Sequence, residues 1–194
     1  MKSMRRIFLL VFVLTATLAS GQVSDFTLVN AVNGQNVSLS SYSGSKAVVI
    51  IFTSNYCPFS KLYEARIKKF HEDFNTKGVQ LLLINPNNPQ SSADDSVEEM
   101  KARAEKNGYS FPYLADKEQK VSSELKALKT PQAFVLVPSA GTFNVVYNGA
   151  IDDNPQVETD VSKEYLKEAV EAVLNGSSPS SAKTYPTGCI IKKG

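Results

Sequence analysis

The sequence predicts one α/β domain in which helices flank a central mixed β-sheet. The chain has 194 residues, of which 42% are hydrophobic and 21% charged, a composition typical of an ordinary globular domain. The β-branched run from Ala47 to Thr53 has no polar alternation, as expected of a strand covered on both faces. Strand-like and helix-like segments then alternate before two neighbouring strands, an order that combines parallel with antiparallel pairing.

The N-terminal half is predicted to contain a β-hairpin, the central strand and a helix-strand pair. Segment 26–39 reads as two short strands around an Asn-Gly turn, which forms an N-terminal extension of the sheet. Apolar residues at three- and four-residue spacing predict an amphipathic helix over 58–77, with Pro58 in its first turn. A glycine ends this helix, residues 79–84 form a second buried strand, and residues 85–93 form a loop.

The C-terminal half continues the alternation and ends in a segment without periodicity. In order, we expect a helix over 94–107, an extended segment over 111–115, a brief helix over 118–128, a hairpin of strands 132–137 and 143–149, and a last helix over 161–174. Residues 176–194 are rich in Ser, Pro, Gly and Lys and are predicted to form a flexible tail.

Residues 1–21 have the pattern of a secretory signal peptide. Three basic residues precede an apolar run, residues 7–18, and small residues follow it. A transmembrane anchor is the alternative, but a membrane span needs about 20 apolar residues. The sequence therefore predicts export to the periplasm or the medium, with residues 22–175 as the folded domain and no stable membrane span after cleavage.

Charge and ligand inventory argue against nucleic-acid and metal binding. The 21 basic and 19 acidic side chains nearly cancel, which leaves no basic footprint for a nucleic acid. A structural zinc needs four nitrogen or sulfur ligands, whereas the chain has two widely separated cysteines and one histidine, His71. The pair Asp152-Asp153 lacks the glycine and terminal glutamate of a calcium loop and is predicted to be a solvated acidic loop. We expect no metal and no cofactor.

Cys57 has a physical reason to be reactive. It lies after the central strand and immediately before Pro58, at the start of the predicted helix. A helix N-terminus carries about half a positive charge and unpaired N–H groups, which favour a thiolate. Cys57 is therefore the candidate nucleophile, and an inert half-buried thiol is the alternative. His71 cannot be its base because about 21 Å of helix separates the two residues.

The sequence around Cys57 and along most of the chain resembles the thioredoxin superfamily, in particular its redoxin and peroxiredoxin-like branch. The resemblance covers about residues 24–175, and its matching pieces are DFTLVNAVNGQNVSLSSYSG, NYCPFSKLYEARI, INPNN, FPYLAD, TPQAFVL and YNGAIDD, with TGCIIK in the tail. It implies a thioredoxin fold and thiol chemistry at Cys57. It also implies that Pro131 is a cis-proline opposite this cysteine. Because proline removes a backbone donor, Thr130 and Pro131 are then expected to leave an open edge for a substrate segment.

Two departures from the family patterns favour a thiol-disulfide enzyme over a peroxidase. Thioredoxins carry Cys-x-x-Cys, but the fourth position here is Ser60, so no local thiol resolves a mixed disulfide. Peroxiredoxins carry a proline, a hydroxyl residue and a later arginine around the cysteine. Ser54 matches the hydroxyl residue, whereas Ile50 replaces the proline and Pro131 occupies the arginine's place.

Cys189 is the only other thiol and lies on the predicted tail. A flexible segment over 175–188 spans at most about 45 Å and typically about 20 Å, enough to reach Cys57. Our hypothesis is that Cys189 is the resolving cysteine for Cys57. A permanent structural bridge between the two, and a Cys189 that pairs between chains, are the alternatives.

The sequence thus predicts an exported thiol-disulfide oxidoreductase in which Cys57 attacks a protein or small-molecule disulfide and forms a covalent intermediate. Cys189 or an external thiol then releases Cys57 from this intermediate. Electrons must come from an external thiol donor, because the chain has no flavin or nicotinamide motif. A peroxiredoxin-like peroxidase that uses Cys57 is the second reading. A redox-inert binding module that holds a partner near Pro131 is the third.

Overall fold

The computed structural model describes residues 21–193, so the predicted signal peptide lies outside the described residues except for Gly21 and stays a prediction. The strands are β1 (Gln22–Val23), β2 (Thr27–Asn30), β3 (Asn36–Ser38), β4 (Ala47–Phe52), β5 (Val79–Asn85), β6 (Tyr113–Ala115), β7 (Lys129–Thr130), β8 (Gln132–Ser139), β9 (Thr142–Gly149) and β10 (Cys189–Ile190). The helices are α1 (Pro58–Phe74), α2 (Val97–Asn107), α3 (Lys120–Glu124) and α4 (Tyr165–Leu174).

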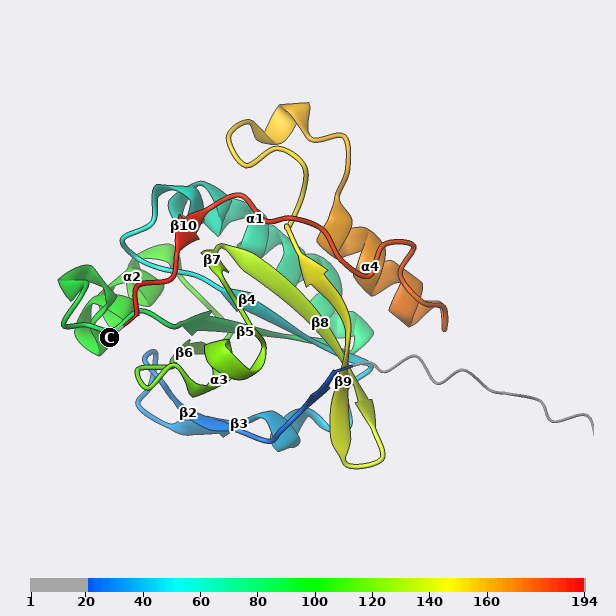
Figure 1. Cartoon of the computed structure of the whole chain (residues 1–194), viewed down its shortest axis with the longest axis horizontal. Coiled ribbons are helices and arrows are strands. Elements are labelled where there is room, and N and C mark those ends of the chain that lie inside the picture. The colour runs from blue at the N-terminus through cyan, green and yellow to red at the C-terminus, as the bar shows by residue number, and fades with distance from the viewer. Residues whose placement is uncertain (1–20, 194) are drawn as a thin grey trace, which may run out of the picture.

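Eight of these strands form one mixed sheet, in the order β1-β9-β8-β4-β5-β6-β2-β3. Strand β4 pairs in parallel with β5 and antiparallel with β8, and β5 pairs in parallel with β6. The hairpin β2-β3 extends the β6 edge, and β9 continues the β8 edge. The predicted mixed sheet with an N-terminal hairpin is therefore confirmed (Figure 1).

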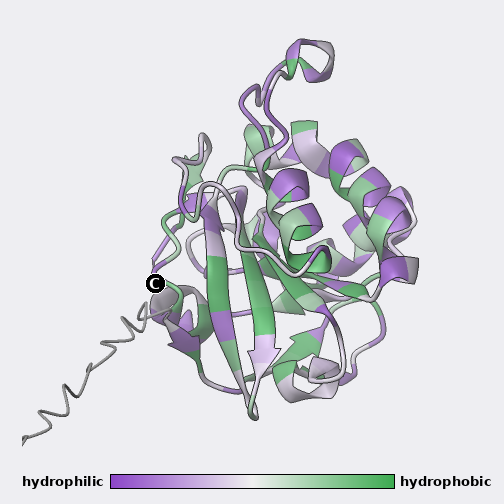
Figure 2. Cartoon of the chain, turned by 90° about the vertical axis from the view of Figure 1, so that its right-hand side faces the viewer, coloured by the Kyte–Doolittle hydropathy of each residue, from purple (hydrophilic) through white to green (hydrophobic). Residues whose placement is uncertain are grey.

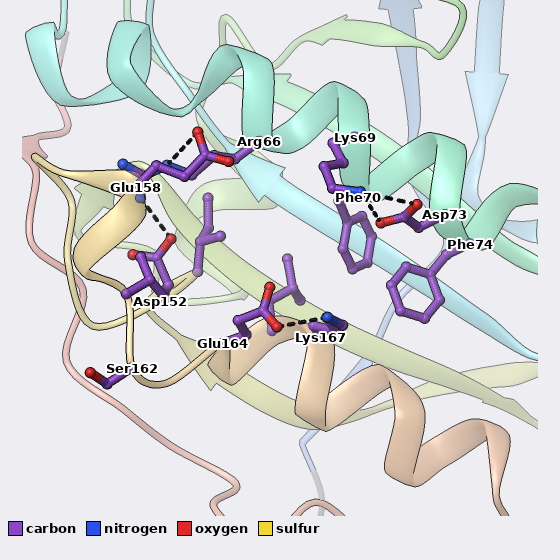
Figure 3. A pocket seen from close by; sticks show the side chains of 13 residues that line it. Arg66, Lys69, Phe70, Asp73, Phe74, Asp152, Glu158, Ser162, Glu164 and Lys167 are labelled. Carbon is purple, nitrogen blue, oxygen red and sulfur yellow. Dashed lines mark hydrogen bonds and ion pairs between the residues drawn. The ribbon is translucent and has the colours of Figure 1, made fainter.

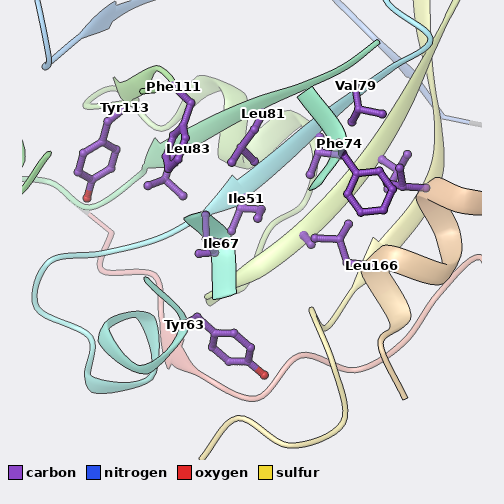
Figure 4. Close-up of a cluster of buried hydrophobic side chains, with 14 of the residues drawn as sticks. Ile51, Tyr63, Ile67, Phe74, Val79, Leu81, Leu83, Phe111, Tyr113 and Leu166 are labelled. Carbon is purple, nitrogen blue, oxygen red and sulfur yellow. The ribbon is translucent and has the colours of Figure 1, made fainter. Parts of the chain in front are cut away.

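The predicted central strand is fully buried because helices and loops cover both faces of the sheet. Alternate residues of β4 separate the core into two halves. Val49 and Ile51 belong to the half packed under α1, α2 and α4, part of which Figure 4 shows, whereas Val48 and Ile50 belong to the half that includes α3. In Figure 2 the hydrophobic residues accordingly concentrate in the central strands, while hydrophilic residues follow the outer faces of the helices.

All four helices are shorter than their sequence patterns predict: α1 and α2 each by three residues, which form 3₁₀ turns or a cap instead, and α3 and α4 by more. Helix α4 begins at Tyr165 rather than Val161, because the preceding residues bond to an acidic loop instead of continuing the helix. Ser162 N–H donates to the Asp153 carboxylate (2.9 Å), and Asp153 N–H donates to the Lys163 carbonyl (3.1 Å). Helix α3 covers only part of the predicted 118–128, because Lys126 adopts a positive φ of 54° that no helix continues through.

The tail forms more structure than its sequence indicates. Residues 189–190 form β10, which pairs antiparallel with β7, and Lys183 bridges to Asn148 of β9. In Figure 1 the tail (red) returns from the end of α4 past β9 to β7. Its predicted flexibility stays a prediction. Within residues 21–193, no helix is long and apolar enough to cross a membrane.

Candidate active site

Cys57 lies at the N-cap position of α1, and Pro58 occupies the first helical turn. The end of β4 and the short loop that follows it place Cys57 at the positive end of the helix, as the sequence predicts. The side chain of Cys57 is completely buried. Burial disfavours a thiolate, whereas the helix N-terminus favours it, so the turn geometry around Cys57 matters for its chemistry.

Cys57 and Cys189 form a disulfide bond, with their Cα atoms 5.8 Å apart. The predicted pairing of the two thiols within one chain is therefore confirmed, and the described residues contain no free cysteine. The two sulfur-bearing residues differ in exposure, because Cys189 is only partly buried whereas Cys57 has no exposed surface. Cys189 is therefore the more exposed residue of the pair.

The bond between Thr130 and Pro131 is cis, as the family resemblance implies. The Thr130 carbonyl oxygen lies 3.0 Å from Cys57 Sγ, so the cis-proline segment borders the disulfide directly. The expectation of an open edge at Thr130 and Pro131 is wrong for this oxidised state. Strand β10 occupies that edge, with Cys189 opposite Thr130 and Ile190 opposite Lys129.

Two glycines allow the tail to lie against the domain. A Cβ on Gly188 would stand 2.7 Å from the Thr130 carbonyl carbon, and a Cβ on Gly149 would stand 2.8 Å from the backbone nitrogen of Thr184. Both obstacles are backbone atoms, which cannot rotate away as the end of a side chain can. The chain therefore has glycine on the tail at one close approach and on β9 at the other.

Main-chain hydrogen bonds extend the tail contact beyond the disulfide. Ile191 N–H donates to the Leu128 carbonyl (3.2 Å), and Ile191 is itself buried. Lys192 N–H donates to Asn87 Oδ1 (2.9 Å), while the Lys192 carbonyl accepts from Gln119 Nε2 (2.8 Å). The disulfide is thus one of several interactions that hold residues 188–192 in place.

The predicted supporting residues Ser54 and Ser60 lie beneath the Cys57 turn, and both are buried. Ser54 Oγ accepts from the backbone N–H groups of Tyr56 (3.1 Å) and Cys57 (3.3 Å). Ser60 Oγ in turn accepts from Ser54 N–H (3.3 Å). These contacts fix the turn that carries Cys57.

Asp95 is the site residue that the sequence reasoning missed. Its carboxylate is buried and accepts a hydrogen bond from Ser54 Oγ (3.0 Å). Burial alone would raise its pKa, but hydrogen bonds from Asn87, Asn85, Ser92 and Asn55 outweigh burial and hold the pKa of Asp95 below its usual value. A signal existed: polar residues follow the parallel strands β4 and β5 at the same edge of the sheet, where an ion or a polar cluster forms.

The two arginines among the described residues pair with carboxylates. Arg103 pairs with Glu64, and Arg66 donates to Asp152 (2.7 Å), which also accepts from the Tyr63 hydroxyl (2.6 Å). The prediction of a solvated loop is therefore wrong for Asp152, which is buried and forms an ion pair with Arg66. Figure 3 shows this pair at a cavity of about 340 Å³ between α1 and α4, whose lining does not include Cys57.

Comparison with known proteins places this geometry in context. The sequence profile of the AhpC/TSA family matches residues 20–153. A hypothetical protein from Sinorhizobium meliloti 1021 is similar, with 31% identity, a TM-score of 0.82 and coverage of 93% of this chain and 97% of that one. No curated protein sequence matches.

Two more distant structures share the fold. A putative thiol:disulfide interchange protein DsbE from Chlorobium tepidum has 18% identity and a TM-score of 0.61, and covers 81% of this chain and 99% of its own. The peroxidoxin BcpB from Mycobacterium tuberculosis has 16% identity and a TM-score of 0.59, with coverage of 81% and 96%. The predicted thioredoxin fold is confirmed.

Proposed function

The chain belongs to the AhpC/TSA family, and from this premise and the geometry of its disulfide we propose that it is a thiol-disulfide oxidoreductase that cycles the Cys57–Cys189 pair. One observation carries the proposal. The disulfide joins a cysteine at a helix N-terminus to a partly exposed cysteine on a segment held mainly by hydrogen bonds. A helix N-terminus stabilises a leaving or attacking thiolate, and a segment of this kind is able to move.

In the reducing half-reaction, the Cys57 thiolate attacks one sulfur of a substrate disulfide. A Cys57–substrate disulfide forms, the substrate S–S bond breaks, and one substrate thiolate leaves. The Cys189 thiolate then attacks Cys57 Sγ, which forms the Cys57–Cys189 disulfide and releases the second substrate thiolate. Two electrons pass from the cysteine pair to the substrate.

The return half-reaction begins at Cys189. A donor thiolate attacks Cys189 Sγ, because Cys57 is buried and Cys189 is partly exposed. The Cys57–Cys189 bond breaks, a donor–Cys189 disulfide forms, and Cys57 leaves as the thiolate at the start of α1. A second donor thiol releases Cys189 and completes the two-electron reduction.

Substrate access requires the tail to move from β7 once the disulfide is reduced. Strand β10 pairs with Lys129 and Thr130, the edge that the sequence assigns to an extended substrate segment. A protein substrate would add its own strand to that edge, in the mode of β-strand addition. In this proposal Thr130 and Pro131 bind the substrate, and the tail of the same chain occupies their site in the oxidised protein.

Oxidation of the reduced protein by two oxidants separates the thiol-disulfide function from the peroxidase function. We expect a stoichiometric model disulfide to form the Cys57–Cys189 bond faster than hydrogen peroxide does. Peroxiredoxins use an arginine near the reactive cysteine, whereas both arginines of the described residues are already paired with carboxylates. Intact-mass analysis of samples quenched over time measures both rates. Faster oxidation by peroxide, with a sulfenic acid at Cys57, would favour the peroxidase. No reaction with either oxidant would favour a binding module.

A further inference from the structure

The buried carboxylate of Asp95 connects the two segments that carry the cysteines. Its two oxygens accept hydrogen bonds from the loop after β4, from the last residue of β5 and from the loop after β5, which includes Ser92. These donors lie in two stretches of the chain, residues 54–55 and 85–92, and the bonds range from 2.7 to 3.0 Å. Asp95 is therefore the common acceptor of a polar cluster beneath the disulfide.

An acceptor-only group sets the direction of every hydrogen bond around it. An ionised carboxylate has no proton to donate. Ser54 must therefore direct its only hydroxyl proton to Asp95, and Asn87 must turn its amide nitrogen, rather than its amide oxygen, to the carboxylate. Asn87 Nδ2 lies 2.8 Å from Asp95 Oδ2 and 3.0 Å from Ser54 Oγ, which agrees with this orientation.

The first consequence concerns the nucleophile. With its proton committed to Asp95, Ser54 Oγ is free to accept from the N–H groups of Tyr56 and Cys57. Asp95 also accepts directly from Asn55 N–H (2.7 Å) in the same loop. Asp95 thus holds the turn that delivers Cys57 to the N-terminus of α1.

The second consequence concerns the tail. Because Asn87 turns its nitrogen to Asp95, its oxygen faces the tail and accepts from Lys192 N–H at 2.9 Å. If the amide were reversed, two donors would meet at this contact. The charge on Asp95 therefore orients the Asn87 amide so that its oxygen accepts from the tail at Lys192, three residues after Cys189.

We propose that Asp95 is a positioning residue that aligns Cys57 and Cys189 for disulfide exchange, through Ser54 on one side and Asn87 on the other. This inference rests on the proposed function for its biological meaning. Its physical consequence is a higher effective concentration of the two thiols, which can be measured whether or not the protein is an oxidoreductase. Asp95 does not touch a sulfur atom and takes no part in the electron transfer.

The test is the equilibrium of the full chain with reduced and oxidised glutathione, which gives the effective concentration of the Cys57–Cys189 pair. We expect Asp95→Asn to lower this value at least about tenfold, since its amide offers donors where only acceptors fit. Ser92→Ala is the matched control. It removes a 2.7 Å bond to the same carboxylate, but Ser92 bonds to neither cysteine segment, so a change within about twofold is expected.

Two variants each disturb one side of the Asp95 network, Asn87 towards the tail or Ser54 towards Cys57. These single-arm variants keep the proposal testable if Asp95→Asn does not fold. Asn87→Ala is expected to lower the effective concentration several-fold. Because it removes only one of the donors to Ser54 Oγ, it is expected to move the pH profile of Cys57 alkylation, in a Cys189→Ser background, less than Ser54→Ala does. Ser54→Ala is expected to move that profile to higher pH by about 0.5 unit, because the turn at the helix N-terminus loosens. Unchanged effective concentration in folded Asp95→Asn, or unchanged readouts in both single-arm variants, would overturn the proposal. Because glutathione equilibrium requires no substrate turnover, failure of the proposed function would be seen separately.

Discussion

The Cys57→Ser variant is expected to lose thiol-disulfide exchange by at least about 10⁴-fold, the scale of loss seen when a covalent nucleophile is removed. A serine hydroxyl at the start of α1 does not ionise near neutral pH, so the helix N-terminus has no anion to stabilise. The measurement is the rate at which a model disulfide is reduced to its free thiols in the presence of an external thiol donor.

The Cys189→Ser variant is the matched control, because it also removes the disulfide but leaves the nucleophile. We expect it to complete the first step and to stop as a mixed disulfide on Cys57, which intact-mass analysis detects as one retained substrate fragment. Exchange that continues at the wild-type rate in Cys57→Ser would contradict the assignment of Cys57. A mixed disulfide found instead on Cys189 in the wild type, with substrate and without donor, would reverse the roles of the two cysteines.

The Gly188→Ala variant is expected to displace the tail from β7. The added methyl group would stand 2.7 Å from the Thr130 carbonyl carbon, where no real Cβ is found, and relief of such overpacking costs about 1–3 kcal/mol. Each 1.4 kcal/mol lowers the effective concentration of the cysteine pair about tenfold. The first step at Cys57 is not expected to slow, because a displaced tail uncovers the thiol.

Gly44→Ala is the control for the glycine substitution itself, since a Cβ on Gly44 meets no atom within 4 Å. It should leave the glutathione equilibrium and the rate of the first step unchanged. An effective concentration in Gly188→Ala equal to that of the wild type would mean that the tail docks in another way. A loss of the first step as well would point to general unfolding, which far-UV circular dichroism would reveal.

The central strand and the flanking helices could be predicted because burial leaves periodic patterns. Strand β4 lies between two other strands and under helices on both sides, so it has no polar alternation. The early start predicted for α4 arose because Val161 continues the apolar spacing of the helix. Side-chain capture by Asp153 is a local competition that periodicity does not record.

The active site was predictable only where chemistry follows local sequence. Cys57 is recognisable from the strand, proline and helix around it. The tail contact depends instead on main-chain hydrogen bonds and on two glycines, which leave no apolar pattern. Asp95 was missed because its donors come from two separate stretches, residues 54–55 and 85–92. Polar residues after two parallel strands indicate a shared sheet edge, but each stretch alone reads as ordinary polar sequence.

The reduction potential of the Cys57–Cys189 pair tests most directly whether this disulfide cycles or only stabilises the fold. Wild-type protein is equilibrated in thiol-disulfide buffers of graded potential, and the oxidised fraction is measured by intact mass after alkylation. A cycling pair is predicted to titrate between about −120 and −270 mV, the range of known thiol-disulfide catalysts. A midpoint below about −300 mV, typical of structural disulfides, would contradict the account.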